Sequence, residues 1–249
     1  MSRALVLFQI IFESLPISSS SHIFFLSTLF DSACMLPESV YYAAHAPTVM
    51  MLGCYFAREL FFITHNYKQL WDQLVVWALG IGIANSITII GYIVLHVVHV
   101  PFSMQVGLMI TTGLLLSLVW CKKLGSDRLS INQAVVIGIV QAISLLPGIS
   151  RLAMTYVVGR WIGLSWWASF RFSCALEATL FAAASAKSLL SLLLSGYSFT
   201  LSFVTIMSIV MAMCIAYLLL WFVEYLMKTG HLWYFGWYMI VPTFFSFFF

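Results

Sequence analysis

Two long apolar stretches of this chain are each broken by a proline with polar residues beside it. The first stretch, residues 4–30, is broken within 9–22 (QIIFESLPISSSSH), and the second, residues 132–162, is broken within 145–151 (LLPGISR). Proline inside a helix removes a backbone hydrogen bond and kinks or ends the helix. The halves on either side of each break are too short to cross a membrane, which takes about 20 residues. Each stretch is therefore predicted to form a hairpin of two short helices that enters and leaves a membrane on one side.

The composition indicates that these hairpins belong to an integral membrane protein. Hydrophobic residues make up 63% of the chain and charged residues 8%, whereas soluble proteins carry roughly 25% charged residues. The net charge of +3 is small and dispersed, so nucleic acid is not a predicted partner. The five cysteines have no CxxC spacing, which argues against a zinc site or a disulfide framework. Six further apolar runs predict membrane-spanning helices, at about 47–64, 73–97, 104–121, 165–192, 200–227 and 231–249.

The predicted fold is an all-α polytopic membrane protein with an internal repeat. Residues 1–123 and residues 124–249 each contain one broken hairpin followed by three spans. Because three is an odd number, the two halves must face opposite ways across the membrane. Such inverted-topology repeats form their sites near the membrane midplane from discontinuous helices. The sequence thus predicts six transmembrane helices and two re-entrant hairpins in a single domain, with the two polar breaks meeting at one site.

The distribution of basic residues predicts the orientation. Lysine and arginine are enriched in cytoplasmic loops, and the loops at 65–72 and 122–131, together with the one near Lys228, fall on one side of the predicted topology. The first hairpin, the HVPF turn, the loop at 193–199 and both termini then face outward. The basic residues on the predicted cytoplasmic side are Lys68, Lys122, Lys123, Arg128 and Lys228.

The first break contains a carboxylate that is costly to place at membrane depth. Ionised groups there usually pair with a partner or take part in function. Glu13 follows Gln9 by four residues, which puts both side chains on one helical face. The pair could hold a divalent cation or position a water molecule. Alternatively, it could be a hydrogen-bonded pair that ties two helices together.

Four consecutive serines, residues 18–21, follow the proline where a new half-helix should begin. Serine is a favoured N-cap, but capping explains only one of the four. Free backbone N–H groups at a helix N-terminus, together with hydroxyls, form an anion site. His22 comes next and could shuttle protons or attack phosphorus, although an isolated histidine is more often structural.

The second break repeats this pattern with a different set of residues. Gly148 permits the turn, Ser150 offers a hydroxyl, and Arg151 offers a planar fork of donors that suits phosphate oxygens. Two facing helix N-termini and an arginine predict a cradle for phosphate.

These segments resemble the motifs of one bacterial family. ESLPISSSSH is similar to the motif EFLPVSSTGH of the undecaprenyl-diphosphate phosphatase family, also known as the bacitracin-resistance family. GIVQAISLLPGISRLAMT resembles the second family signature, PGxSR followed by a threonine, and ASFRFS at 168–173 resembles a family segment ending in RFSF. The resemblance covers nearly the whole chain.

The resemblance implies a fold with six spanning helices and two re-entrant hairpins, and a hydrolase activity. The implied reaction converts a C55 polyprenyl diphosphate to the monophosphate carrier and inorganic phosphate, on the outer side of the bacterial cytoplasmic (inner) membrane. This reaction recycles the carrier for peptidoglycan synthesis and confers bacitracin resistance. A divalent cation, Mg²⁺ or Ca²⁺, is expected as cofactor. The expected partners are the lipid substrate and membrane lipids, and the chain could form a homo-oligomer.

The family roles carry over by position. Glu13 matches the catalytic glutamate, and Gln9 matches the Glu-or-Gln position before it, so both are expected to hold the cation. Ser19 matches the proposed nucleophile and His22 the motif histidine, and either could attack phosphorus. Arg151 is expected to stabilise charge on the transferred phosphoryl group. The residues expected to bind the substrate are Ser18, Ser20, Gly148, Ser150 and Thr155.

The sequence departs from the family motifs at two places. Residues 20–21 are Ser-Ser where Thr-Gly is usual, and residues 152–153 are Leu-Ala where Ser-Gly is usual.

The alternative function is a flippase or anion transporter, because inverted repeats are common in transporters. A carrier needs anion donors but no nucleophile or base, so the acid, serine and histidine together favour hydrolysis.

The remaining polar residues in apolar segments have structural interpretations. Glu177, Arg171 and Lys187 are expected to pair or to snorkel to the interface, with attraction of the diphosphate as the alternative. Gln141 is expected to form a hydrogen bond between helices. Five histidines fall at predicted span ends and are expected to be interfacial: His45, His65, His96, His99 and His231.

Overall fold

The computed structural model describes residues 2–29, 42–62, 67–121, 124–195 and 202–248, and within these ranges the side chains of 2–3, 29, 58–62 and 67–74 are not described. The described chain is helical apart from its turns, with one isolated bridge between Ser126 and Leu164. The helices are α1 (Ser2–Phe12), α2 (Ser19–Leu29), α4 (Ala46–Phe62), α5 (Tyr67–Val98), α6 (Met104–Ser117), η1 (Leu118–Trp120), α7 (Ile131–Ile143), α8 (Arg151–Trp161), α9 (Trp166–Leu194), α10 (Phe203–Thr229) and α11 (Tyr234–Phe245).

Both predicted breaks separate two short helices. The first proline, Pro16, lies in the turn between α1 and α2, and the second, Pro147, lies in the turn between α7 and α8. A turn is a place where the missing N–H of proline costs no helical hydrogen bond. α1 packs against α2 and α7 packs against α8, so each broken stretch is a helical hairpin.

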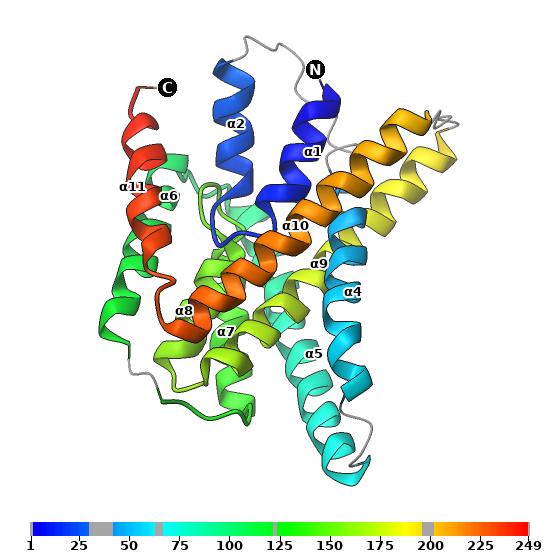
Figure 1. The fold of residues 1–249 in the computed structure, drawn as a ribbon. Helices are drawn as coiled ribbons and strands as arrows, with labels where there is room; N and C mark the ends of the chain where they lie inside the picture. The colour runs from blue at the N-terminus through cyan, green and yellow to red at the C-terminus, as the bar shows by residue number, and fades with distance from the viewer. Residues whose placement is uncertain (1, 30–41, 63–66, 122–123, 196–201, 249) are drawn as a thin grey trace.

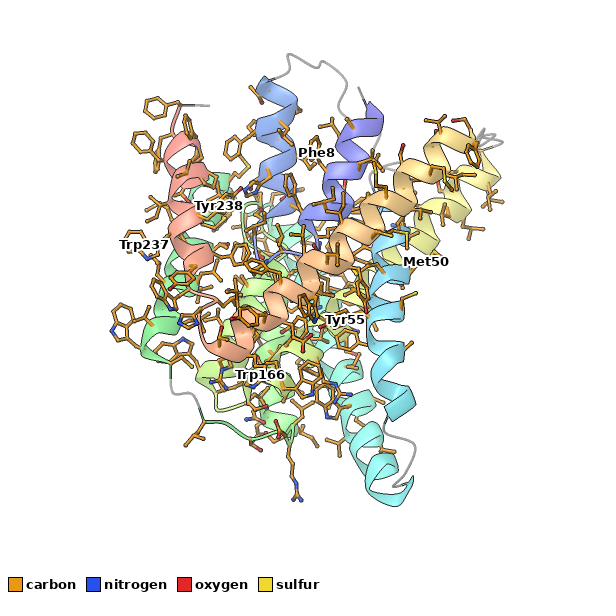
Figure 2. The ribbon with its side chains drawn as sticks, in the orientation of Figure 1. Phe8, Met50, Tyr55, Trp166, Trp237 and Tyr238 are labelled. Atoms are coloured by element: carbon orange, nitrogen blue, oxygen red, sulfur yellow. The ribbon has the colours of Figure 1, made fainter. Side chains whose placement is uncertain are left out.

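Within the described residues, three helices are long and apolar enough to cross a membrane: Val75–Val98 within α5, Trp166–Leu194 (α9) and Phe203–Thr229 (α10). The other predicted spans, at about 47–64, 104–121 and 231–249, correspond to the shorter helices α4, α6 and α11. α11 begins after a turn at Gly230, whose φ of 77° ends α10, and it contains Pro242. Large apolar side chains such as Met50 (64% exposed) and Trp237 (60% exposed) point away from the bundle (Figure 2). An apolar exterior of this kind fits a lipid environment.

The helices pack in pairs that link the two halves of the chain. α10 crosses in front of α9, and α11 lies beside α6 along one edge (Figure 1). α1 packs against α10, α5 against α7, α4 against α9, and α8 against both α6 and α9. The largest buried apolar cluster includes Ile10, Tyr55, Leu152 and Phe170, from α1, α4, α8 and α9. The core is therefore shared between the hairpins and the long helices.

Both chain termini lie at the same end of the molecule as the open end of the first hairpin (Figure 1). The segment 124–130 lies toward the opposite end of the same view (Figure 1). Arg128 and Lys228, two of the basic residues behind the orientation prediction, are exposed. The side chains of Lys68, Lys122 and Lys123 lie outside those described.

Candidate active site

The tips of the two hairpins open onto one cavity of about 730 Å³. The first hairpin contributes Glu13, Ser18, Ser19 and Ser20, and the second contributes Ser150 and Arg151. The remaining walls come from α9, from Tyr92 of α5 and from the segment that leads into α4. Six of the residues predicted to act on or bind the substrate thus line the same space, although the two hairpins are more than a hundred residues apart in sequence.

Glu13 lies in the turn just after α1 and is only 5% exposed. One carboxylate oxygen, Oε1, accepts a hydrogen bond of 3.1 Å from Gln9 Nε2, and the other, Oε2, accepts one of 2.5 Å from Thr48 Oγ1. The imidazole Nδ1 of His45 also pairs with Oε1. A buried carboxylate is costly unless it is hydrogen-bonded or paired, and these three donors meet that requirement. The Gln9–Glu13 pair therefore exists, and it is tied to α4 through Thr48 and His45.

The four serines lie in different environments. Ser18 is buried just before α2, and its hydroxyl lies 2.9 Å from that of Ser21 and 3.2 Å from that of Ser20. Ser21 is fully buried and Ser20 is exposed. Ser19, the first residue of α2, lines the cavity, and its hydroxyl has no hydrogen-bond partner among the described residues. Ser19 therefore has the serine hydroxyl most available for chemistry.

His22 does not line the cavity. Its Nδ1 lies 2.7 Å from the backbone oxygen of Ser18 and must carry the proton there, since a carbonyl only accepts. Its Nε2 lies 3.0 Å from the hydroxyl of Tyr238 on α11, and the two rings stack with centroids 5.8 Å apart. His22 thus connects the first hairpin to α11, where Tyr238 is labelled in Figure 2.

The tip of the second hairpin is held by close contact with α6. Gly148 has a φ of 86°, and a Cβ at this position would lie 2.3 Å from the backbone oxygen of Met104. A Cβ at Gly107 would lie 2.1 Å from the oxygen of Pro147. Thr111 donates to Gly148 O (3.2 Å) and accepts from the backbone N–H of Ser150 (3.0 Å). The turn can take this position only because neither glycine has a side chain.

The turn delivers two side chains to the start of α8. Ser150 is the N-cap, with its hydroxyl accepting from Ala153 N at 3.3 Å, and Arg151 is the first helical residue. Thr155 is buried one turn later and donates to the backbone oxygen of Arg151 (2.8 Å). Gly148 and Thr155 do not line the cavity, so they shape this helix start and do not face the space itself.

The guanidinium of Arg151 lies over the ring of Phe181 on α9, with Cζ 4.7 Å from the ring centroid. In the described part of the chain no carboxylate is within ion-pair distance of it. Glu177, one turn before Phe181, is buried in the cavity wall and interacts electrostatically with both Arg151 and Glu13. Lys187 lines the cavity further along α9 and is exposed. An arginine without a carboxylate partner beside a helix N-terminus is suited to bind an anion.

Several polar residues of the apolar segments can now be assigned. The prediction that His45 is interfacial is wrong, because this side chain is 3% exposed and pairs with Glu13. Glu177 and Lys187 line the cavity, whereas Arg171 lies over Trp77 and Trp167, at 5.6 and 5.5 Å. The predicted hydrogen bond of Gln141 between helices is confirmed, since its Nε2 donates to Asn85 Oδ1 on α5 at 3.5 Å.

Sequence reasoning did not identify His45, Thr48 or Phe181 as parts of the site. One signal was present for the first two: they are three residues apart, which puts them on one helical face. Phe181 carried no signal, because it is one apolar residue among many in α9.

The polar groups near Glu13 can be compared with the needs of a divalent cation. Mg²⁺ and Ca²⁺ prefer oxygen ligands, and the buried Oε1 of Gln9 has no partner within the described ranges. Those ranges contain no cluster of three or more His, Cys, Asp or Glu side chains with metal-binding geometry. The unpartnered Oε1 of Gln9, beside the carboxylate of Glu13, is an oxygen of the kind that such a cation prefers.

Comparisons with known proteins cover almost the whole chain. Residues 4–245 match the family model described as bacitracin resistance protein BacA. A relative from Chromohalobacter salexigens, named undecaprenyl-diphosphatase, is 30% identical over an aligned length of 209 residues, and the alignment covers 78% of this chain and 77% of that protein. Undecaprenyl-diphosphatases of Pelagibacter ubique and Hahella chejuensis are 27% identical over 233 residues (88% of this chain, 86% of that protein) and 28% identical over 245 residues (91% and 89%).

Proposed function

This chain belongs to the bacitracin resistance protein BacA family, and we propose that it hydrolyses undecaprenyl diphosphate to undecaprenyl phosphate and inorganic phosphate. The observation that carries this proposal is one cavity lined by Glu13, in the turn after α1, and by Ser19 and Arg151, the first residues of α2 and α8. A serine hydroxyl, a carboxylate and an arginine are the groups that phosphoryl transfer through a covalent intermediate needs. The transporter alternative is not favoured, because the relatives are diphosphatases.

In the proposed mechanism Ser19 is the nucleophile. Its Oγ forms a bond to the terminal phosphorus, the bond from that phosphorus to the bridging oxygen breaks, and undecaprenyl phosphate leaves. Water then cleaves the phosphoserine and releases inorganic phosphate. Ser19 is preferred over His22 because the serine hydroxyl lines the cavity, whereas both ring nitrogens of His22 have partners elsewhere. His22 is assigned a positioning role at the start of α2.

Glu13 is assigned the role of general base, and Arg151 that of charge stabiliser. Glu13 accepts the proton of the attacking hydroxyl, which raises its nucleophilicity. Arg151 donates to the oxygens of the transferred phosphoryl group, whose charge spreads over them in the transition state. Gln9 and Glu13 would hold a divalent cation, Mg²⁺ or Ca²⁺, which neutralises phosphate charge when bound.

The phosphate groups are proposed to bind between the two helix starts. Ser18, Ser20 and Ser150 offer hydroxyls, and the first turn of α8 offers backbone N–H groups. Gly148 and Thr155 contribute by holding the turn and the first helical residues in place. The apolar surfaces around the cavity suit the polyprenyl chain.

The topology is proposed to be an inverted repeat of residues 1–123 and 124–249, with six spans and two re-entrant hairpins. Exchanging the halves maps α1 onto α7, α4 onto α9, α5 onto α10 and α6 onto α11. The α1–α10 contact then corresponds to α7–α5, and α4–α10 corresponds to α9–α5, while α4–α9 and α6–α11 map onto themselves. This symmetry of packed pairs supports the repeat. The proposed location is the bacterial inner membrane, with the site open to the outer side.

The test is release of phosphate from undecaprenyl diphosphate by the purified protein in detergent. We expect release by the wild-type protein, loss of at least about a hundredfold in Ser19→Ala, and inhibition by a chelator that added Mg²⁺ or Ca²⁺ reverses. Absence of release by the wild-type protein, or undiminished release by Ser19→Ala, would contradict the proposed function or the proposed nucleophile, respectively.

A further inference from the structure

We propose that His45 and Phe181 are positioning residues for the two charged groups of the site, the carboxylate of Glu13 and the guanidinium of Arg151. The contact between His45 and Phe181 links the surroundings of the two groups and also keeps the groups apart. His45 fixes the carboxylate of Glu13, and Phe181 holds the guanidinium of Arg151 away from that carboxylate. This inference rests on the proposed diphosphatase reaction and adds two residues to it.

The first part of the connection is the contact between His45 and Glu13. The side chains of His45 and Glu13 are 3% and 1% exposed, and Nδ1 pairs with Oε1. An ionised carboxylate only accepts hydrogen bonds, so Nδ1 carries the proton. Thr48, three residues later, donates to the other oxygen, Oε2. The start of α4 therefore supplies one donor to each carboxylate oxygen, and two donors at different oxygens fix the plane of the carboxylate.

The second part is the phenyl ring of Phe181, which contacts both His45 and Arg151. The imidazole of His45 stacks on Phe181, with centroids 4.1 Å apart and planes inclined by 10°. Arg151 Cζ lies 4.7 Å from the centroid of the same phenyl ring. Phe181 is 2% exposed, so its position is fixed by packing. One ring thus contacts the partner of Glu13 and the guanidinium of Arg151.

The chemical consequence concerns the charge of Arg151. A cation over an aromatic face is stabilised without being neutralised, and its N–H donors stay available. Contact with a carboxylate would use those donors and cancel the charge that attracts phosphate. Glu177 interacts electrostatically with Arg151, yet among the described side chains neither Glu177 nor Glu13 forms an ion pair with it. Phe181 keeps the guanidinium in a position where the substrate is its anionic partner.

The two positioning residues are expected to affect different kinetic constants. His45→Leu removes a donor to the base, so we expect kcat to fall about 100-fold with KM changed less than about threefold. His45→Gln keeps a donor, so its kcat should stay within about tenfold of the wild-type value.

Phe181→Leu leaves Arg151 free to approach the carboxylates, so KM should rise about 10-fold. Phe181→Tyr keeps the aromatic face, so its KM should stay close to the wild-type value. Phe181→Met serves in place of the leucine variant if that variant does not fold.

The controls carry the same substitutions away from the cavity. His231→Gln changes an exposed histidine, and Phe170→Leu changes a fully buried phenylalanine of the same helix. Phe170→Leu should lower thermal stability and leave KM unchanged. Wild-type kcat in His45→Leu together with wild-type KM in Phe181→Leu would overturn the inference.

A binding measurement separates this inference from the proposed function. Farnesyl diphosphate binding in detergent, measured by calorimetry, should weaken about 10-fold in Phe181→Leu and stay unchanged in Phe170→Leu. A wild-type protein that binds the probe but releases no phosphate contradicts the hydrolytic function while the Phe181 comparison still decides the positioning role. Equal affinity of wild-type and Phe181→Leu proteins overturns that role.

Discussion

The two hairpin tips reach the same cavity by different physical means. The first tip is held by side chains: Glu13 takes donors from Gln9, His45 and Thr48, and His22 bonds Tyr238. The second tip is held by backbone approach, with Gly148 against α6. A buried carboxylate must be surrounded by donors, so the first tip depends on polar pairs. The second tip positions the guanidinium of Arg151 and the N–H groups at the start of α8. This depends on a fixed backbone more than on side-chain hydrogen-bond partners.

The comparison predicts that the largest loss of activity comes from the first tip. Glu13→Ala removes the proposed base and, with it, the carboxylate that accepts from three buried donors. We expect kcat to fall about 1,000-fold and the free energy of unfolding to fall by about 1–3 kcal/mol. Phosphate release and thermal unfolding in detergent measure the two effects. Asp127→Ala, at an exposed carboxylate outside the cavity that accepts from Ser165 Oγ, is the control for activity and should leave kcat unchanged.

At the second tip, the largest loss of stability should come from adding a single methyl group. Gly148→Ala places a Cβ 2.3 Å from Met104 O at a φ of 86°, and we expect a loss of about 2–3 kcal/mol in stability. Gly163→Ala has a φ of 94° but nothing within 4 Å of its Cβ, and Gly113→Ala has open space within a helix. Gly163→Ala should therefore show the cost of the backbone conformation alone, and Gly113→Ala should show none. If Gly148→Ala lost no more stability than Gly163→Ala in a thermal unfolding measurement, close contact with α6 would not be what holds the tip.

The smallest effect is expected at the contact between the first tip and α11. Tyr238→Phe removes the hydroxyl that lies 3.0 Å from His22 Nε2 and should cost about 1 kcal/mol of stability, with a modest decrease in kcat. Tyr225→Phe makes the same change at an exposed position and should have no effect. If Tyr238→Phe matched Tyr225→Phe in a thermal unfolding measurement, the first tip would be held by Glu13 and its donors alone.

The same contrast explains what could be read from the sequence. Proline breaks, serines and an arginine are local signals, so the two hairpins and most of the cavity lining were predictable from residues near Pro16 and Pro147. The odd number of spans in each half then predicted that the breaks meet. Two of the three partners of Glu13 were not predictable in this way, because His45, just before α4, and Thr48, in α4, are brought to Glu13 only by folding.

The support of the second tip was less visible still. Gly107 and Thr111 are ordinary residues of an apolar helix, and their importance depends on the distance between α6 and the turn at Gly148. The exact start of the last helix also depends on a local feature of the structure, since α11 begins only after the turn at Gly230. Contacts between distant elements have no periodic pattern in the sequence, which is why these features required the structure.

The bond between His22 and Tyr238 has a consequence for biosynthesis. The two residues are 216 positions apart, and a ribosome adds about 5–20 residues per second. The first hairpin is therefore made roughly 10–45 s before the helix that bonds its histidine. During that interval the serine-rich tip lacks one of its supports, so the first tip takes its finished geometry only after α11 has been synthesised and has joined the bundle.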